Sequence, residues 1–204
     1  MKILRAGQHR RMPWKNGGGE TTEIMAFPEG SGLDQFGWRL SMARVASDGP
    51  FSHFPEVDRT LCVIEGEGLA LAVASQAEIV LTQASAPFCF PGDVAVTSRL
   101  VKGPITDLNV MTRRGRWSHK VTRLCVEGPR EIERESGVTL LLSRSQRLAL
   151  SGTDGPEMLD VDDAALFGGA CNIRLDPNAS LATAYLVEFS AVVLRHLTPN
   201  GRMQ

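Results

Sequence analysis

Short segments of β-forming residues recur along the whole chain, and turn residues separate them. Gly, Pro, Asp and Ser interrupt the segments, and many segments alternate apolar with polar side chains, as half-buried strands do. The segments predicted as strands are 21–27, 38–45, 59–64, 68–74, 78–82, 94–100, 106–112, 120–126, 138–143, 147–151, 172–175 and 184–193. Only 131–137 and 160–166 are predicted as short helical turns. Many short strands at close spacing predict an all-β sandwich or barrel.

A weak internal repeat refines this fold class. The segments that resemble one another are 68–71 and 147–150, 79–81 and 158–161, and 90–93 and 167–169. Their offset is roughly eighty residues, which suggests two similar barrels, or one barrel with a degenerate copy. The polar stretch at 128–131 would separate an N-terminal module at 1–127 from a C-terminal, degenerate module at 128–204. We do not expect the two halves to be independent.

The charge balance argues against several classes of partner. Lys and Arg number 22 against 23 Asp and Glu, so no basic excess supports binding to nucleic acid or to an anionic membrane. No apolar run is long enough for a transmembrane helix, and the first residues lack the apolar core of a signal peptide. We therefore expect a soluble, cytoplasmic protein. The oligomeric state is left open, with a homodimer as one option.

Each of the four cysteines stands alone beside apolar residues: Cys62, Cys89, Cys125 and Cys171. No Cys-x-x-Cys spacing is present, so the cysteines indicate neither a zinc site nor a redox pair. We expect them to act as small buried hydrophobic residues in a reducing compartment.

The segment Met-Pro-Trp-Lys-Asn-Gly-Gly-Gly-Glu-Thr-Thr-Glu at residues 12–23 is the least ordinary part of the sequence. Trp14 offers a flat stacking surface, Lys15 a cation, and Asn16 both a donor and an acceptor. The glycines that begin at Gly17 let the main chain approach a ligand or another backbone closely. The residues alone do not separate a ligand-binding segment from a surface turn with an anchoring tryptophan.

Two further groups of polar residues lie next to predicted strands. His53 and Arg59 follow a turn-rich stretch, and Arg39 lies within the strand at 38–45. An inward arginine needs a carboxylate from the protein or from a ligand, so Arg59 is either a structural ion pair or a ligand contact. His53 is either a hydrogen-bonded loop histidine or part of the site. In the third group, Asp107 and Asn109 share one face of the strand at 106–112 and would line a barrel mouth or face solvent.

Metal and nucleophile motifs are missing from the sequence. His9, His53, His119 and His196 are far apart, and no His-x-His pair places two imidazoles on one strand face. No Gly-x-Ser-x-Gly elbow indicates a serine nucleophile. We therefore expect no metal, no cofactor and no identifiable catalytic residue.

Several motifs resemble those of the HutD/Ves family. The first is the segment at 12–19 followed by Thr-Thr-Glu-Ile at 21–24, and the others are 38–41, 48–52 with 58–59, and 107–111 with 114–115. The resemblance implies a cupin-type fold, a double-stranded β-helix barrel present as two modules (a bicupin). It also implies a role in bacterial histidine utilisation, whereas the Ves branch is associated with environmental stress. The chain lacks the histidines of the metal-binding cupin motifs, which argues against metal-dependent chemistry.

The favoured function is a metal-free accessory or regulatory protein that binds a small carboxylate such as urocanate or N-formylglutamate. In this hypothesis Arg39 or Arg59 pairs with the carboxylate, Trp14 packs on the ligand, and Asn16 and Asn109 orient it. The alternative is a hydrolase or isomerase that uses Lys15, His53, Glu23 or Asp107 as a general acid or base, although no positioned partner is evident. A protein-interaction module is a third option without a sequence feature of its own.

Overall fold

The chain folds almost entirely into antiparallel β-strands. The computed structural model describes residues 1–204 except 16, 75, 146, 153–154, 178–180 and 194–204. Within these residues one short 3-10 helix is present, η1 (Ala6–Gln8). No helix in the described part of the chain is long and apolar enough to cross a membrane. The predicted all-β class is confirmed.

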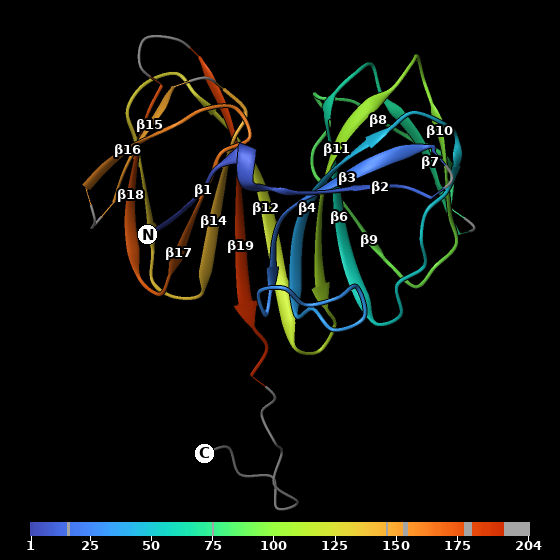
Figure 1. Cartoon of the computed structure of the whole chain (residues 1–204), viewed down its shortest axis with the longest axis horizontal. Coiled ribbons are helices and arrows are strands. Elements are labelled where there is room, and N and C mark those ends of the chain that lie inside the picture. The colour runs from blue at the N-terminus through green and yellow to red at the C-terminus, as the bar shows by residue number, and fades with distance from the viewer. Residues whose placement is uncertain (16, 75, 146, 153–154, 178–180, 194–204) are drawn as a thin grey trace, which may run out of the picture.

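Two β-rich lobes lie side by side (Figure 1). The N-terminal lobe contains a six-stranded and a four-stranded sheet. In spatial order, the six strands are β2 (Arg10–Pro13), β3 (Gly19–Phe27), β4 (Trp38–Val45), β11 (Ile105–Arg113), β6 (Val57–Glu65) and β9 (Phe88–Pro91). The four strands are β5 (Gly49–Pro50), β10 (Val96–Leu100), β7 (Leu69–Val73) and β8 (Ile79–Leu81).

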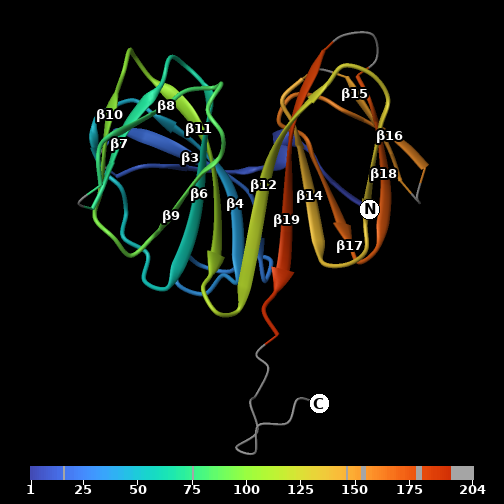
Figure 2. The same ribbon diagram turned by 180° about the vertical axis from the view of Figure 1, so that it is seen from behind.

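The C-terminal lobe contains a five-stranded and a four-stranded sheet. The five strands are β1 (Lys2–Leu4), β17 (Ala164–Gly168), β14 (Val138–Ser143), β19 (Ala182–Ala191) and β12 (Trp117–Val126). The four strands are β13 (Arg130–Arg134), β18 (Cys171–Asp176), β15 (Leu148–Gly152) and β16 (Gly155–Leu159). Within the C-terminal lobe, β12 and β19 lie on the side that faces the N-terminal lobe, as both views show (Figures 1 and 2).

The strand order of one lobe repeats in the other. The order β4-β11-β6-β9 corresponds to β12-β19-β14-β17, and β5-β10-β7-β8 corresponds to β13-β18-β15-β16. The repeat seen in the sequence lies on matching strands, because 68–71 overlaps β7 and 147–150 overlaps β15. β1 and β12, which precede the predicted boundary at residue 127, pair with strands of the C-terminal lobe.

Most of the predicted strands are present, and 38–45 and 138–143 have the predicted bounds. The two predicted helical turns are wrong. Residues 130–134 form β13, which pairs with β18, and 164–168 form β17 in the five-stranded sheet. In both segments tertiary pairing overrides a weak local preference.

A shared apolar seam joins the lobes. Trp38, Leu40 and Met42 of β4 point to the seam, where they belong to one buried cluster with residues of β14 and β19 such as Leu140 and Phe189. The rings of Trp38 and Phe189 stack with centroids 4.3 Å apart. Since successive strand residues face opposite sides, the residues between them on β4 point into the N-terminal lobe.

The two lobe interiors differ in character. The interior of the C-terminal lobe is an apolar cluster that includes Leu141, Leu150 and Ile173. The interior of the N-terminal lobe has an apolar part, with Leu61, Leu71 and Val96, but it also contains buried charged residues.

The cysteines are not uniformly buried. Cys62 is buried, Cys171 is intermediate, and Cys89 and Cys125 are exposed, so the expectation of apolar burial is wrong for the last two. Cys125 lies between two buried neighbours on β12 and points to solvent, whereas the Cys89 thiol lies 3.0 Å from Oγ1 of the buried Thr60. All four are free thiols.

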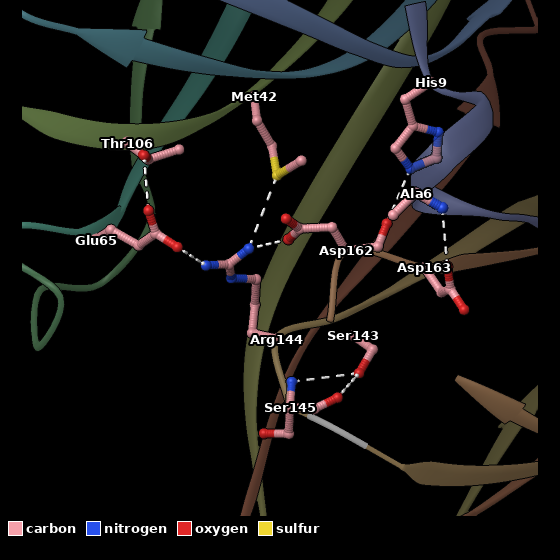
Figure 3. Close-up of polar contacts among 10 residues, drawn as sticks. All are labelled: Ala6, His9, Met42, Glu65, Thr106, Ser143, Arg144, Ser145, Asp162 and Asp163. Atoms are coloured by element: carbon pink, nitrogen blue, oxygen red, sulfur yellow. Dashed lines mark hydrogen bonds and ion pairs between the residues drawn. The ribbon is translucent and has the colours of Figure 1, made fainter. Parts of the chain in front are cut away.

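Arg144 connects the lobes through charged groups (Figure 3). Its Nη2 donates to Oε1 of Glu65 at 2.5 Å, and its Nη1 donates to Oδ1 of Asp162. The carbonyl oxygen of Asp162 in turn lies 2.8 Å from Nε2 of His9 in the N-terminal segment. The Arg144 side chain is only 9% exposed, so its charge depends on these carboxylates.

Replacing Arg144 should weaken the whole fold. We expect Arg144→Met to lower the free energy of unfolding by about 1.5–3 kcal/mol, because hydrogen bonds to charged groups are lost. Arg174→Met is the matched control, since the Arg174–Glu131 pair is exposed and should contribute about 1 kcal/mol or less. Urea denaturation of both variants measures the difference, and equal losses would contradict a role of Arg144 in joining the lobes.

Candidate ligand-binding site

A row of side chains crosses the interior face of the six-stranded sheet. Met111 of β11 lies opposite Arg39 of β4 on one side and opposite Arg59 of β6 on the other. Residues that lie opposite each other in antiparallel strands project to the same face. Both arginines therefore enter the N-terminal lobe, where they are 5% and 4% exposed.

Asp107 and Asn109 occupy the next two rows of the same face. Asp107 lies opposite Ala43 and Val63, and Asn109 lies opposite Ser41 and Leu61. The prediction that these two residues share a strand face is confirmed. They are 1% and 9% exposed, which excludes the alternative of a solvent face.

Arg39 is satisfied by protein groups. Its Nε donates to Oε2 of Glu23 at 2.6 Å, and its Nη1 donates to Oγ of Ser41 at 3.1 Å. Since this ion pair is itself buried, Arg39 stays neutralised without a ligand. The predicted direct contact of Arg39 with a carboxylate remains untested.

The positive charge of Arg59 is much less well compensated than that of Arg39. Its strongest polar contact in the described chain is a long one, from Nη1 to the carbonyl oxygen of Ser52 at 3.4 Å, and its Nε has no hydrogen-bond partner there. The rings of Phe51, Phe54 and Phe90 surround the guanidinium, with centroids 5.0, 5.5 and 5.2 Å from Cζ. The described residues provide no carboxylate within ion-pair distance, so the structural ion pair considered for Arg59 is not observed.

Burial shifts the pKa values of this group. Loss of hydration and, to a smaller extent, the positive charge of Arg39 lower the pKa of Arg59 to about 10, against the opposing attraction of Asp107. Burial raises the pKa of Asp107 to about 7, although Arg59 acts in the other direction. Oδ1 of Asp107 and Oδ1 of Asn109 have no hydrogen-bond partner among the described residues. The interior thus combines a poorly compensated cation with two unused acceptors.

The β2–β3 hairpin closes over the apolar end of the same interior. Nε1 of Trp14 donates to Oγ1 of Thr21 at 2.8 Å, and its ring packs against the interior cluster. A Cβ at Gly19 would lie 2.2 Å from the carbonyl oxygen of Arg44 and 3.0 Å from the Trp14 ring, so this position requires glycine. Trp14 therefore anchors the hairpin from inside the lobe.

The other predicted residues of the hairpin point elsewhere or are not described. Lys15 is exposed, and Gly17 lies in the left-handed region at φ 71° with its N–H donated to the carbonyl oxygen of Trp14. Asn16 lies outside the described residues. Ligand contacts by Trp14, Lys15, Asn16 and Gly17 remain predictions.

His53 lies at a surface hollow at the opposite end of the interior. The hollow has a volume of about 460 Å³ and is lined by Leu33, Asp34, Ser52, His53, Phe54, Pro55, Val57 and Arg113. Nε2 of His53 lies 3.1 Å from the carbonyl oxygen of Asp93, which fits the reading of a hydrogen-bonded loop histidine. Its role toward a ligand remains a prediction.

Sequence reasoning did not select the three phenylalanines around Arg59. Phe90 reaches Arg59 only because β9 pairs with β6, with Phe90 opposite Arg59. Phe51 and Phe54 flank His53, and their spacing around a turn could have indicated an aromatic enclosure. Within the described residues, no group of three or more His, Cys, Asp or Glu side chains is arranged to hold a metal ion.

Comparison with known proteins assigns the chain to a family. The HutD family model matches residues 6–183. The chain belongs to the HutD family. An uncharacterized 21.2 kDa protein from the hutC 3′ region of Pseudomonas putida is 36% identical over 151 residues, which are 74% of this chain and 77% of that protein. Protein Ves of Citrobacter koseri is 36% identical over 171 residues, covering 81% and 84% of the two chains. The predicted HutD/Ves membership is confirmed.

Solved structures of HutD relatives have the same fold. HutD from Pseudomonas fluorescens SBW25 is 32% identical with a TM-score of 0.79 over 93% of this chain and 98% of that one. A conserved protein of unknown function from Pseudomonas aeruginosa PAO1 is 36% identical with a TM-score of 0.85 at the same coverage. A cupin 2 conserved barrel domain protein from Leptotrichia buccalis, 8% identical, reaches a TM-score of 0.57 over 83% of this chain and 88% of that one. The fold is therefore of the cupin type.

The buried carboxyl of Asp107 should make stability depend on pH. Its pKa in the folded state is about 7, above the ordinary value of 3.8, so the folded protein holds a proton that the unfolded chain releases between these values. Stability from this group is present below about pH 4 and is lost as the pH rises through about 7. We expect Asp107→Asn to remove this loss, which amounts to at most about 1.4 kcal/mol for each pH unit in that window.

Chemical denaturation of wild type and Asp107→Asn at pH 4 to 8 tests this expectation. The stability of the variant relative to wild type should increase with pH, whereas the exposed-site control Asp34→Asn should follow wild type. A difference between Asp107→Asn and wild type that stays constant across the range would show that Asp107 ionises normally.

Proposed function

We propose that this HutD-family protein binds a small carboxylate inside its N-terminal lobe, without a metal, as an accessory or regulatory protein of histidine utilisation. The observation that carries the proposal is Arg59, a buried guanidinium with no carboxylate partner among the described residues. Candidate ligands are intermediates of the pathway such as urocanate and N-formylglutamate.

A carboxylate ligand would supply the counterion and the hydrogen-bond acceptors that Arg59 lacks. Aromatic faces stabilise a cation only in part, and a buried arginine gains most from a bidentate carboxylate. The contact to the Ser52 carbonyl is long at 3.4 Å, so a ligand oxygen could replace it with a shorter, charge-assisted bond.

The unused acceptors indicate a second ligand group. Oδ1 of Asp107 and Oδ1 of Asn109 would each accept a hydrogen bond from a ligand N–H. Urocanate has an imidazole N–H, and N-formylglutamate has a formamide N–H, so both combine a carboxylate with a donor. A simple fatty acid lacks the donor and should bind less tightly.

We further propose that the two lobes are two cupin modules and that only the first binds the ligand. The repeated strand order supports two modules, with the division near residue 127 modified by β1 and β12. Thr139 of β14, opposite Phe167, occupies the position that Arg59 has opposite Phe90. At the matching end of the second lobe, the cation Arg134 already forms an ion pair with Glu188, the residue opposite Thr139. The rest of that interior is an apolar cluster, so no unpaired arginine like Arg59 is evident there among the described residues.

The link to histidine utilisation comes from a relative. The Pseudomonas putida protein is described by its position 3′ of hutC. A small-molecule-binding protein with a relative encoded 3′ of hutC suits a role that senses or buffers a pathway intermediate. Nucleic acid is not part of the proposal, because the formal net charge is −1.

One observation favours the alternative of an enzyme. Asp107 is buried beside a cation and has a pKa of about 7, which suits a general acid or base at neutral pH. A hydrolase or isomerase acting on a histidine-degradation intermediate would convert urocanate or N-formylglutamate during incubation, and Asp107→Asn would abolish the conversion. Binding without conversion supports the favoured function.

Thermal unfolding with ligand tests the proposal. A ligand at about 100 times its Kd stabilises the native state by about 2.7 kcal/mol, which corresponds to a Tm increase of about 5–10 °C in a chain of this size. We expect Arg59→Met to lose this increase while the Tm of the ligand-free protein stays equal or rises, because an uncompensated buried charge is removed.

Arg44→Met is the matched control for Arg59→Met. Arg44 lies on β4 of the same sheet, but it is exposed and should leave the ligand-dependent Tm increase unchanged. If neither urocanate nor N-formylglutamate raises the Tm of wild type at millimolar concentration, carboxylate binding is excluded for these ligands. An equal response of Arg59→Met and wild type would place any binding elsewhere.

A further inference from the structure

Residues 52–55, which we call the lid, separate Arg59 from the surface hollow. Ser52 and Phe54 line the hollow from outside. From inside, the Ser52 carbonyl accepts the hydrogen bond of Arg59, and the Phe54 ring lies 5.5 Å from its guanidinium. Since Arg59 is only 4% exposed, a ligand reaches its guanidinium only after a neighbouring group has moved.

The lid is the part of this enclosure that no sheet holds in place. Phe90 and Met111 also neighbour Arg59, but they lie opposite it in the β6–β9 and β11–β6 ladders. The lid contains neither strand nor helix. The hollow provides about 460 Å³ of space on its outer side. The lid is therefore the group that moves away from Arg59 at the smallest cost in backbone pairing.

A few local hydrogen bonds fasten the lid. Besides the long contact to Arg59, the bonds given by the described residues are Phe54 N–H to the Gly92 carbonyl at 2.8 Å, His53 Nε2 to the Asp93 carbonyl at 3.1 Å, and Arg113 Nη1 to the Pro55 carbonyl at 2.9 Å. Two of these bonds use a side chain, that of His53 or of Arg113. A substitution therefore removes either bond without changing the phenylalanine rings around Arg59.

The lid ends at a strained residue. Glu56 follows the lid directly and lies in the left-handed region at φ 56°, which costs free energy for a side chain with a Cβ. Its carbonyl oxygen accepts a hydrogen bond from the N–H of Arg114 at 2.8 Å, so this end of the lid is anchored. Rotation of Glu56 into a common backbone conformation would relieve the strain and turn the lid away from Arg59.

We propose that the lid is a gate, which closes over Arg59 in the free protein and opens into the hollow to admit a carboxylate. The inference rests on the proposed function, since that function gives Arg59 its ligand. In the closed gate the Ser52 carbonyl occupies the place of a ligand oxygen. It is a weak substitute, because it is neutral and its contact to Arg59 is long at 3.4 Å.

Chemical modification of Arg59 measures the opening without any ligand. Phenylglyoxal reacts with accessible guanidinium groups, and peptide mass spectrometry gives the rate at each arginine. His53→Ala and Arg113→Met should each raise the rate at Arg59 about three- to tenfold, because the closed lid loses one hydrogen bond. The rate at Arg39 should stay unchanged, since Arg39 is as deeply buried on the same sheet but is bound by Glu23 instead of the lid.

Two controls separate the gate from general loosening of the fold. Arg116→Met is the matched control for Arg113→Met, because Arg116 is exposed and lies three residues further along the chain. It should change the rate at neither Arg59 nor Arg39. The gate is wrong if both lid variants leave the rate at Arg59 unchanged, or if they raise the rates at Arg59 and Arg39 equally.

Adding ligand distinguishes failure of the gate from failure of the proposed function. Urocanate or N-formylglutamate should protect Arg59 from phenylglyoxal and leave Arg39 unaffected. If the lid variants accelerate modification of Arg59 but neither compound protects it or raises the Tm, the gate stands and the proposed function fails for these ligands. If a compound raises the Tm while the lid variants leave the rate at Arg59 unchanged, the proposed function stands and the gate is wrong.

Discussion

The six-stranded sheet of the N-terminal lobe is covered on both faces, and this double burial governs what its strands can hold. On β4, residues that face the seam are apolar, such as Trp38 and Leu40, and they pack against the other lobe. The alternate residues face the interior, where Arg39 and Ser41 replace the hydrophobic side chains that a core strand normally presents. The apolar packing of the seam face fixes the position of the sheet, and the sheet in turn positions the charged side chains on its interior face.

Arg39 and Arg59 show how one environment produces two different roles. They flank Met111 on the same face and are equally buried. Arg39 forms an ion pair with Glu23 and therefore has a structural role. Arg59 instead packs against aromatic rings and donates one long hydrogen bond to the carbonyl oxygen of Ser52. A buried charge without a counterion costs free energy, so its retention requires a gain outside the folding reaction. Ligand binding supplies that gain in the proposed function.

Strands can be predicted from the sequence where apolar and polar residues alternate clearly. The polar residues that point inward from those strands can be predicted in the same way. Asp107 and Asn109 could be assigned to one face because a strand has a period of two. The charged strand β13 and the small-residue strand β17 were missed, since only pairing with β18 and β14 makes them strands. The enclosure of Arg59 by Phe90, the pairing of Arg39 with Glu23 and the hollow beside Phe54 all depend on register, which local pattern does not specify.

The repeated strand order has a consequence for how such a chain can change over evolutionary time. One lobe has an apolar interior, and the other contains charges that would be easy to replace with better-packing residues. If the N-terminal lobe binds a carboxylate as proposed, substitutions that fill its charged interior would raise the melting temperature and remove the ligand contact together. Stability and function would then oppose each other in only one of the two similar halves of this chain.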